Sequence, residues 1–305
     1  MAGAELRIIC GPTAAGKSRL ALALAERYRA TIISADSRQV YRAFDIGTAK
    51  PTASERARVP HAGIDVAEPE ERHSAAKWAT GAAGWIGTSL AAGRTPVIVG
   101  GTGLYLRALI QPLFEEPPLD AAQRMALALH LDSLSLAELR AWCERVDPPL
   151  AGLGRTQLLR AIEMATLTGQ RLSDLHRLAA RAPVHTARYL VVDPGPSLAE
   201  RIAARVDAML SNGWADEVRA LLGTVSETAP AWKASGYGWV RALVEGRIAE
   251  AEARERIVIE TRQYAKRQRT WFRHQLPPDR TTRVSPDDPE LDRLAAQWWE
   301  GKGEA

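Results

Sequence analysis

The sequence predicts an α/β protein with an open parallel sheet that is flanked by helices. Four short apolar segments, three of them rich in β-branched residues, are candidate strands: Leu6–Cys10, Thr31–Ser34, Thr95–Val99 and Arg188–Val192. Good helix formers without Gly or Pro follow the first segment over 17–29. Apolar strands that alternate with helical stretches are typical of parallel sheets with helices on both faces.

Each candidate strand has a local justification. The first ends at Gly11-Pro12, which marks the beginning of a loop. The second and third, TIIS and TPVIV, are rich in residues with high β propensity, and Pro96 lies near a strand start, where proline is tolerated. The fourth, RYLVV, is similar in character. After Asp193 the sequence is mostly helical and ends in a Trp-bearing tail for which it makes no prediction.

The stretch 113–183 differs from the rest of the chain because it contains no convincing strand. Helical patterns cover 119–131, 135–145 and 156–168, and proline pairs interrupt the chain at 117–118 and 148–149. We therefore expect an all-helical insertion domain over 113–183. The sheet domain would then consist of 1–112 and 184–305.

Composition excludes several classes of protein. The 305 residues are 46% hydrophobic and 25% charged, which is ordinary for a globular chain. No run approaches the roughly 18 apolar residues of a membrane helix, and the first ten residues do not resemble a signal peptide. The two cysteines, Cys10 and Cys143, are too few for a disulfide framework or an all-cysteine zinc site. We expect a cytoplasmic monomer without membrane contact; its net charge of +4, 40 basic minus 36 acidic residues, is mild.

A phosphate-binding motif follows the first candidate strand. GPTAAGKS matches G-x-x-x-x-G-K-[ST], in which backbone amides and a helix N-terminus surround phosphate oxygens. Lys17 would neutralise those oxygens, and Ser18 could ligate Mg²⁺. The motif does not identify the phosphate compound and by itself favours a nucleoside triphosphate. It predicts that a diphosphate group contacts eight residues: Gly11, Pro12, Thr13, Ala14, Ala15, Gly16, Lys17 and Ser18.

Polar residues follow the second and third candidate strands. The carboxyl ends of neighbouring parallel strands meet at one crevice, so we expect Asp36 to face the phosphate loop. Its carboxylate could ligate Mg²⁺ through water or accept a proton, whereas the alternative is that Asp36 or Ser37 caps a following helix. Thr102, after Gly100 and Gly101, could bond to a substrate or serve as a helix N-cap.

A basic segment lies near the C-terminus. Residues 262–273 contain five basic residues and no acidic one. Arg262, Lys266, Arg269 and Arg273 are spaced four, three and four apart, so on a helix they form one stripe. Such a stripe suits a phosphate backbone, and the alternative is an ordinary solvated helix face.

Together these motifs resemble the tRNA dimethylallyltransferases, also called tRNA isopentenyltransferases, of the bacterial type. The matching segments span nearly the whole chain in the expected order: GPTAAGKS (11–18), ISADSRQVY (33–41), DIGTAKP (45–51), VGGTGLYLRAL (99–109), RAIE (160–163), ERI (200–202) and QYAKRQRTW (263–271). The resemblance implies a P-loop NTPase-like open sheet with the helical insertion.

The resemblance also implies a reaction. A dimethylallyl group would pass from dimethylallyl diphosphate to N6 of adenosine 37 in tRNAs that read codons beginning with U, with Mg²⁺ as cofactor and diphosphate as product. Asp36 would be the base. Lys17, Mg²⁺ on Ser18 and Arg201 would stabilise the departing diphosphate, and Thr13 and Thr102 would place the substrates.

Contacts with the tRNA anticodon stem-loop are implied as well. A stacked adenine cannot enter such a pocket, so the target base should be flipped out of the loop. The expected contacts lie after two strands, in the helical insertion and on the basic stripe: Asp36, Ser37, Arg38, Gln39, Thr102, Arg124, Thr156, Gln157, Leu158, Leu159, Arg160, Arg262, Lys266 and Arg269.

Two other functions share the phosphate loop. A small-molecule or nucleoside kinase would have the same sheet and would turn over ATP with a small acceptor. A GTP-dependent switch would need an Asn-Lys-x-Asp motif, but the only asparagine, Asn212, is followed by glycine. The combined motifs favour the transferase over both.

Overall fold

The computed structural model describes residues 5–111, 119–178 and 184–301. The chain forms two compact units, which we call the sheet unit, Met1–Ile110 with His185–Ala305, and the helical unit, Gln111–Val184. The domain boundaries predicted from the sequence, after residues 112 and 183, lie outside the described residues.

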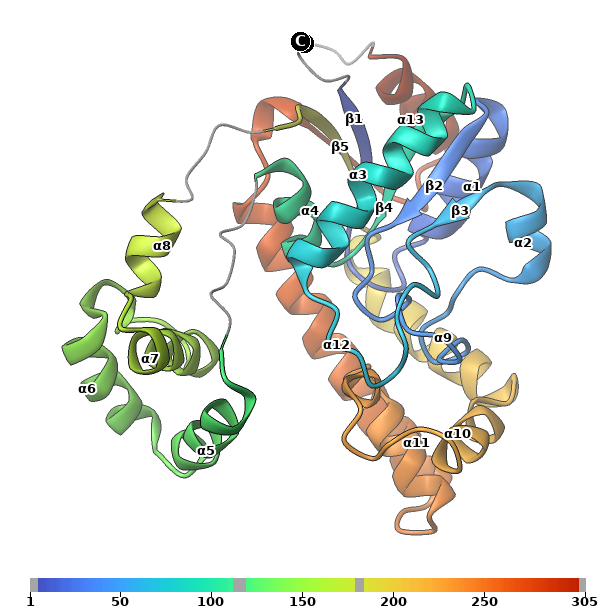
Figure 1. Cartoon of the computed structure of the whole chain (residues 1–305). Helices are drawn as coiled ribbons and strands as arrows, with labels where there is room; N and C mark the ends of the chain where they lie inside the picture. The colour runs from blue at the N-terminus through green and yellow to red at the C-terminus, as the bar shows by residue number, and fades with distance from the viewer. Residues whose placement is uncertain (1–4, 112–118, 179–183, 302–305) are drawn as a thin grey trace. The chain divides into compact units, whose positions relative to one another are not determined.

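The sheet unit is built on six parallel strands in the order β3-β2-β4-β1-β5-β6 (Figure 1). Ile8 in the central strand pairs with Ile98 on one side and Tyr189 on the other. The prediction of an open parallel α/β sheet is therefore confirmed. The strands are β1 Leu6–Cys10, β2 Ala30–Ser34, β3 His61–Ala62, β4 Thr95–Gly100, β5 Ala187–Val192 and β6 Thr281–Val284.

The two edge strands were not predicted from the sequence. β3 contains only two residues and has no periodicity to detect. β6 reads TTRV, with a half-buried pair of threonines and an exposed arginine, so its composition resembles a loop more than a buried strand. β3 is formed by its pairing with β2, and β6 by its pairing with β5.

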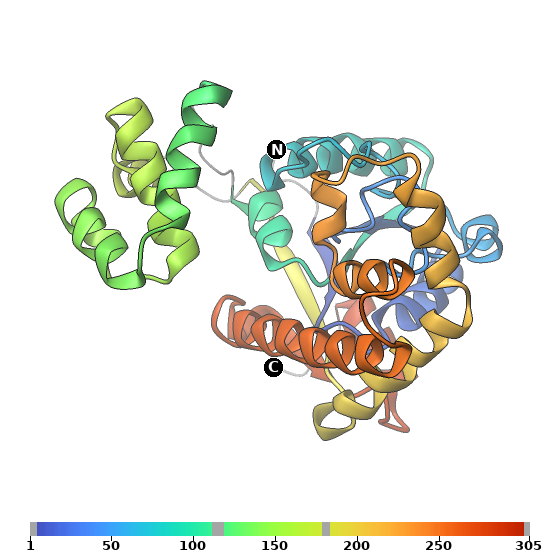
Figure 2. The same ribbon diagram turned by 90° about the horizontal axis from the view of Figure 1, so that it is seen from below.

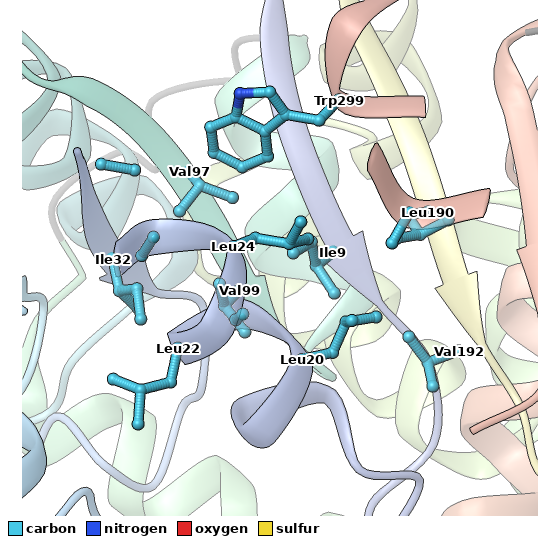
Figure 3. Close-up of a cluster of buried hydrophobic side chains, with 14 of the residues drawn as sticks. Ile9, Leu20, Leu22, Leu24, Ile32, Val97, Val99, Leu190, Val192 and Trp299 are labelled. Carbon is cyan, nitrogen blue, oxygen red and sulfur yellow. The ribbon is translucent and has the colours of Figure 1, made fainter. Parts of the chain in front are cut away.

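One face of the sheet is covered by α1 Lys17–Arg27 and α13 Leu291–Glu300. Figure 3 shows leucines of α1 beside Ile9, Val99 and other strand residues in one apolar cluster. The Trp-bearing tail is thus an ordered helix. Trp298 and Trp299 are both buried in this cluster, and Trp299 stacks on Tyr28 with ring centroids 5.0 Å apart.

The opposite face is covered by α3 Ala75–Ala91 and α4 Gly103–Ile110. The indole of Trp78 is fully buried and donates a hydrogen bond of 2.9 Å to the backbone oxygen of Ser34, at the end of β2. It also stacks on Tyr105 with ring centroids 4.8 Å apart. These contacts fix the carboxyl end of β2, from which the candidate site is built. A short helix, α2 Ala53–Arg58, precedes β3.

Four helices lie at the end of the sheet toward which the strands point (Figures 1 and 2). The longest, α12, packs against α9 and α11, and its buried Gln268 reaches the loops that follow β1 and β4. The site at this edge is therefore closed by segments distant in sequence. The four helices are α9 Leu198–Ser211, α10 Trp214–Leu222, α11 Tyr237–Val244 and α12 Glu250–His274.

The helical unit contains four α-helices over its described residues: α5 Ala121–Asp132, α6 Leu136–Val146, α7 Arg155–Thr168 and α8 Leu172–Leu178. Leu139, Leu158, Ile162 and Met164 are fully buried in its own core, which explains why the segment is compact. Within the described parts of both units, no helix is long and apolar enough to cross a membrane.

Candidate active site

The phosphate loop curls tightly between β1 and α1. Gly11 has a φ of +142°, and a Cβ there would lie 2.1 Å from the backbone oxygen of Val192, so only glycine fits. Gly16 also has positive φ, and helix α1 begins directly after it at Lys17. The first turn of α1 contains no acidic residue. The unpaired amides at this helix start are therefore available to an anion.

Lys17 is the cation of this loop. Its Nζ donates a hydrogen bond of 2.6 Å to the backbone oxygen of Pro12, which holds the side chain over the loop. Burial and the neighbouring Arg205 guanidinium lower the pKa of Lys17 to about 8, while Asp36 acts in the opposite direction. Two cations share one enclosed space here, an arrangement that a bound polyanion would stabilise.

Asp36 lies at the same edge, two residues after β2. Its Oδ1 accepts a hydrogen bond of 2.8 Å from the backbone amide of Arg38, and the residues that follow form a turn rather than an α-helix. The helix-cap alternative for Asp36 is therefore wrong. Its carboxylate faces a cavity that Lys17 and Ser18 also line, so the structure brings together the predicted loop and carboxylate.

Thr102 joins the ends of β4 and β2. Its Oγ1 accepts a hydrogen bond of 3.1 Å from the backbone amide of Ser37 and lies 3.4 Å from the Ser37 Oγ. The hydroxyl is thus directed to the neighbouring loop rather than to the first turn of α4. Tyr264 of α12 also hydrogen-bonds Thr102, and burial raises the pKa of Tyr264 to about 12.

The main cavity is enclosed by segments from the whole sheet unit. Its lining combines polar groups from the phosphate loop, the Asp36 turn and α12 with aliphatic residues of α1, β2 and β4. Such a mixed lining suits a ligand with a charged head and an apolar tail. The principal lining residues are Thr13, Lys17, Ser18, Ala21, Leu22, Ile32, Ser34, Asp36, Gln39, Lys50, Val99, Arg205, Tyr264 and Gln268.

A second cavity adjoins the first, because Thr13, Asp36, Arg205 and Tyr264 line both. Its remaining walls come mainly from α9, from Trp214 and from Arg38 and Thr48. Asp36 therefore has access to two adjacent spaces, as a base between two substrates would require.

Arg205, rather than the predicted Arg201, lines the two cavities. The Arg201 side chain does not line either cavity; it forms an ion pair with Asp287 and contacts the Ser197 hydroxyl. Arg205, one helical turn later on α9, lines both cavities and forms no ion pair in the described part of the chain. Burial lowers its pKa, and Asp36 acts against that shift. A half-buried guanidinium without a paired carboxylate is suited to an anionic ligand.

The sequence also did not single out Gln268. Its Oε1 accepts a hydrogen bond of 2.8 Å from the backbone amide of Thr13, and its Nε2 donates one of 2.9 Å to the backbone oxygen of Gly101. The side chain thereby fixes the phosphate loop to the end of β4. Its occurrence in the QYAKRQRTW segment beside Tyr264 was the available signal.

The basic stripe on α12 is only partly a free surface. Arg262, Lys266 and Arg273 are exposed, and within the described residues none of them forms an ion pair. Arg269 is different, because its guanidinium is bonded to Asp193 and to the backbone oxygen of Gly195. The prediction that Arg269 contacts RNA therefore conflicts with its role in holding α12 against the end of β5.

In the helical unit, some of the residues predicted to contact RNA are buried and others are exposed. Leu158 is fully buried in the core, so its side chain cannot contact RNA as predicted, and Leu159 packs partly against that core. Thr156 and Gln157 are exposed at the start of α7.

Arg124 and Arg160 share the carboxylate of Glu163. Arg124 Nε lies 2.5 Å from Glu163 Oε1, and Arg160 Nη1 lies 2.6 Å from Glu163 Oε2. All three side chains are at least two-thirds buried, with exposed fractions of 26%, 28% and 14%. The Arg124–Glu163 pair joins α5 to α7, and both guanidinium groups are paired with this carboxylate in the absence of RNA.

The oxygen donors in the main cavity are suited to a magnesium ion that takes its remaining ligands from the substrate. Among the described residues, no group of three or more His, Cys, Asp or Glu side chains could hold a metal alone. Ser18 and Asp36 nevertheless present hard oxygen donors to the main cavity. Mg²⁺ usually takes one or two protein oxygens together with water and substrate phosphates, which matches this donor set.

Comparison with known proteins gives the family. The chain matches the family model described as IPP transferase over residues 39–275 and the one described as Isopentenyl transferase over residues 4–61. A tRNA dimethylallyltransferase of Anaeromyxobacter sp. (strain Fw109-5) is 43% identical over 277 residues, covering 89% of this chain and 92% of the relative. One of Stenotrophomonas maltophilia (strain K279a) is 39% identical over 282 residues, covering 88% and 89%.

Solved structures agree with this assignment. The full-length tRNA isopentenylpyrophosphate transferase of Bacillus halodurans superposes with a TM-score of 0.71 at 31% identity, covering 98% of this chain and 97% of the other. The corresponding enzyme of Staphylococcus epidermidis gives 0.68 at 30% identity, covering 97% of both chains. The phosphate loop, the carboxylate opposite it and these matches over most of the length show that the chain belongs to the IPP transferase family.

Proposed function

We propose that this protein is a tRNA dimethylallyltransferase, which moves a dimethylallyl group from dimethylallyl diphosphate to N6 of adenosine 37 in tRNAs reading codons that begin with U. The observation that carries the proposal is the shared cavity of Lys17, Asp36 and Arg205. Two cations can hold a diphosphate there while a carboxylate faces the acceptor. Family membership supports this reaction over the kinase alternative.

The acceptor step requires a base. The lone pair on adenine N6 is delocalised into the ring, so removing a proton as the C–N bond forms makes the nitrogen more reactive. We assign this role to Asp36, which lines both adjoining cavities. The carboxylate accepts the N6 proton, N6 bonds to C1 of the dimethylallyl group, and the C1–O bond breaks with its electron pair leaving on the diphosphate.

The donor step requires stabilisation of the diphosphate as its charge grows. The amides at the start of α1, the Lys17 ammonium and the Arg205 guanidinium are fixed before the reaction and need little rearrangement. When bound, Mg²⁺ would neutralise further charge on the diphosphate, and Ser18 is the residue that would hold it.

The family enzymes named above act on tRNA, and the exposed basic residues of α12 supply a suitable surface. Arg262 and Lys266 precede the segment of α12 in which Gln268 contacts the phosphate loop. We propose that they bind RNA phosphates near the target base. In the helical unit, the exposed Thr156 and Gln157 remain the proposed contacts.

Binding of the donor should depend on pH through Lys17. The pKa of this residue is about 8, lowered from 10.5, so Lys17 loses its proton as the pH rises through 8. The negatively charged diphosphate binds the protonated, positively charged form of Lys17 more tightly than the neutral form. We therefore expect the affinity for dimethylallyl diphosphate to fall by about tenfold per pH unit above that value. Calorimetric titration without Mg²⁺ between about pH 7 and pH 10 measures this slope, and Lys17→Met should abolish it. An equally steep slope in Lys17→Met would assign the titration to another group.

The basic surface of α12 gives a prediction about salt dependence. Replacing both Arg262 and Lys266 with Ala should weaken binding of an anticodon stem-loop RNA and reduce the slope of log K against log[salt] by about one for each phosphate that the protein no longer binds. Fluorescence anisotropy at several salt concentrations measures both quantities. The control replaces Arg219 and Arg293, two exposed arginines of α10 and α13. An equal effect in the control would show that only total charge matters.

A transfer assay tests the proposed function itself. The purified protein is incubated with Mg²⁺, radiolabelled dimethylallyl diphosphate and an unmodified anticodon stem-loop that carries adenosine at the target position. A second RNA carries guanosine there. Label in the first RNA alone supports the proposal. Absence of label in both, with ATP consumed in the presence of a small acceptor, would support the kinase instead.

A further inference from the structure

The loop Asp45–Pro51, which we call the cover loop, supplies walls to both cavities. Lys50 and Pro51 line the main cavity, and Gly47 and Thr48 line the second. The loop contains no helix or strand of its own apart from turns, so its position depends on contacts from outside. The end of the loop is held by the buried Lys50, whose Nζ bonds to the Tyr41 backbone oxygen and to the Asp65 carboxylate. The start of the loop is held by Glu217, on α10.

The Glu217 carboxylate binds the start of the cover loop. Its Oε2 accepts hydrogen bonds from the backbone amides of Asp45 and Ile46, at 2.9 and 2.7 Å. Its Oε1 accepts a hydrogen bond of 2.6 Å from the hydroxyl of Tyr237 on α11. Tyr237 is fully buried, and burial followed by the Glu217 charge raises its pKa, so this hydroxyl stays protonated and donates. Charge-assisted bonds of this kind are stronger and more directional than neutral ones.

Close packing between Gly47 and Trp214 also restricts the position of the cover loop. A Cβ on Gly47 would lie 2.2 Å from the indole of Trp214, which is only 1% exposed and begins the helix that carries Glu217. The same helix therefore fixes the loop by hydrogen bonds at its start and by close contact at Gly47.

The loop in turn contacts the turn that contains the proposed base. Gln39 donates hydrogen bonds from Nε2 to the backbone oxygens of Thr48 and Ala49, at 3.2 and 3.0 Å. Its Oε1 accepts one of 2.8 Å from the Ser34 hydroxyl at the end of β2. Hydrogen bonds thus run from Glu217 through the cover loop to the segment between Ser34 and Gln39, in which Asp36 lies.

We propose that Glu217 is a positioning residue for the transfer reaction: it clamps the cover loop against α10 and α11 and so sets the geometry of both cavities, without contact with either substrate. The inference rests on the proposed function for its effect on rate. Misplacement of reacting groups by about 1 Å can cost on the order of 100-fold in rate, so a loose cover loop would slow chemistry more than it weakens binding of diphosphate to the phosphate loop.

The test compares Glu217→Ala with Glu217→Gln. Glutamine keeps an oxygen for the two loop amides and an amide group that can donate to the Tyr237 oxygen, so it should restore the clamp. The matched control is Asp216→Ala, which removes a carboxylate from the preceding residue of the same helix, where it pairs with Arg219. Tyr237→Phe, which removes one hydroxyl, is a milder variant if Glu217→Ala does not fold.

The first readout, amide hydrogen exchange, does not depend on activity. In Glu217→Ala, exchange over 45–51 should accelerate by about tenfold or more, because two amides lose their acceptor, while exchange over 11–18 stays unchanged. Glu217→Gln and Asp216→Ala should match the wild type. Unchanged exchange over 45–51 in Glu217→Ala would overturn the clamp, even if the wild type proved to transfer no prenyl group.

The second readout is single-turnover transfer with saturating donor and RNA. We expect Glu217→Ala to be slower by about 10- to 100-fold, with its affinity for inorganic diphosphate within about twofold of the wild type and Glu217→Gln within about threefold of the wild-type rate. Faster loop exchange with an unchanged transfer rate would overturn the positioning role. Equal impairment of the Ala and Gln variants would also overturn it. A wild type that transfers no label would instead refute the proposed function.

Discussion

Asp36→Asn should lose transfer activity while keeping its structure and its affinity for the donor. Asparagine retains an oxygen that can accept the 2.8 Å hydrogen bond from the Arg38 amide, so the turn after β2 should persist. It cannot accept the N6 proton. General-base catalysis contributes typically about 10²- to 10⁴-fold, and we expect a loss of that order in the single-turnover rate.

The measurement uses enzyme in excess over labelled donor, with RNA saturating, so that chemistry rather than product release is observed. Asp36→Ala should be no more active than Asp36→Asn, and it should also loosen the turn because the Arg38 amide loses its acceptor. Wild-type rates in Asp36→Asn would show that Asp36 is not the base.

Arg205→Ala should reduce transfer by about 10²- to 10³-fold, the usual effect of removing one fixed group that stabilises developing charge. The guanidinium lines both cavities and lacks an ion pair among the described residues, so its charge is available to the diphosphate. Arg205→Lys should recover only part of the rate, because a single ammonium does not reproduce the planar fork of donors.

Arg201→Ala is the matched control for this prediction. Arg201 lies one turn earlier on α9 and pairs with Asp287, away from the cavity lining. Its removal should leave the transfer rate within about threefold of the wild type, as expected for loss of a partly exposed ion pair. If Arg201→Ala were the more damaging of the two, the diphosphate would have to bind beside Arg201 rather than in the cavities that Arg205 lines.

Local patterns explain why the centre of the fold could be predicted. β1, the phosphate loop and α1 are contiguous, and each is determined by its own residues: an apolar run, two constrained glycines and a series of helix formers. The meeting of Asp36 with this loop follows from the rule for parallel strands, without long-range detail. The position of Asp36 opposite the phosphate loop therefore requires only that the two strands are parallel neighbours.

Other features could not be predicted because residues far apart in the sequence determine them. Arg201 and Arg205 share a helical face, and only Asp287, far along the chain, determines which of them is paired. Arg269 belongs to the basic stripe by spacing, yet Asp193 binds it from another element. Leu158 lies among the residues of the helical insertion predicted to contact RNA, but the packing of α6 on α7 buries it. The edge strand β6 likewise depends on its pairing with β5.

The most direct measurement is a crystal structure of the protein with an unreactive thio analogue of dimethylallyl diphosphate, Mg²⁺ and an anticodon stem-loop RNA. We expect the diphosphate within hydrogen-bond distance of Lys17, Arg205 and the amides of the phosphate loop, with the target adenine flipped out and its N6 about 2.6–3.2 Å from Asp36. A diphosphate outside the phosphate loop, or an adenine N6 directed away from Asp36, would contradict the assignment of these residues.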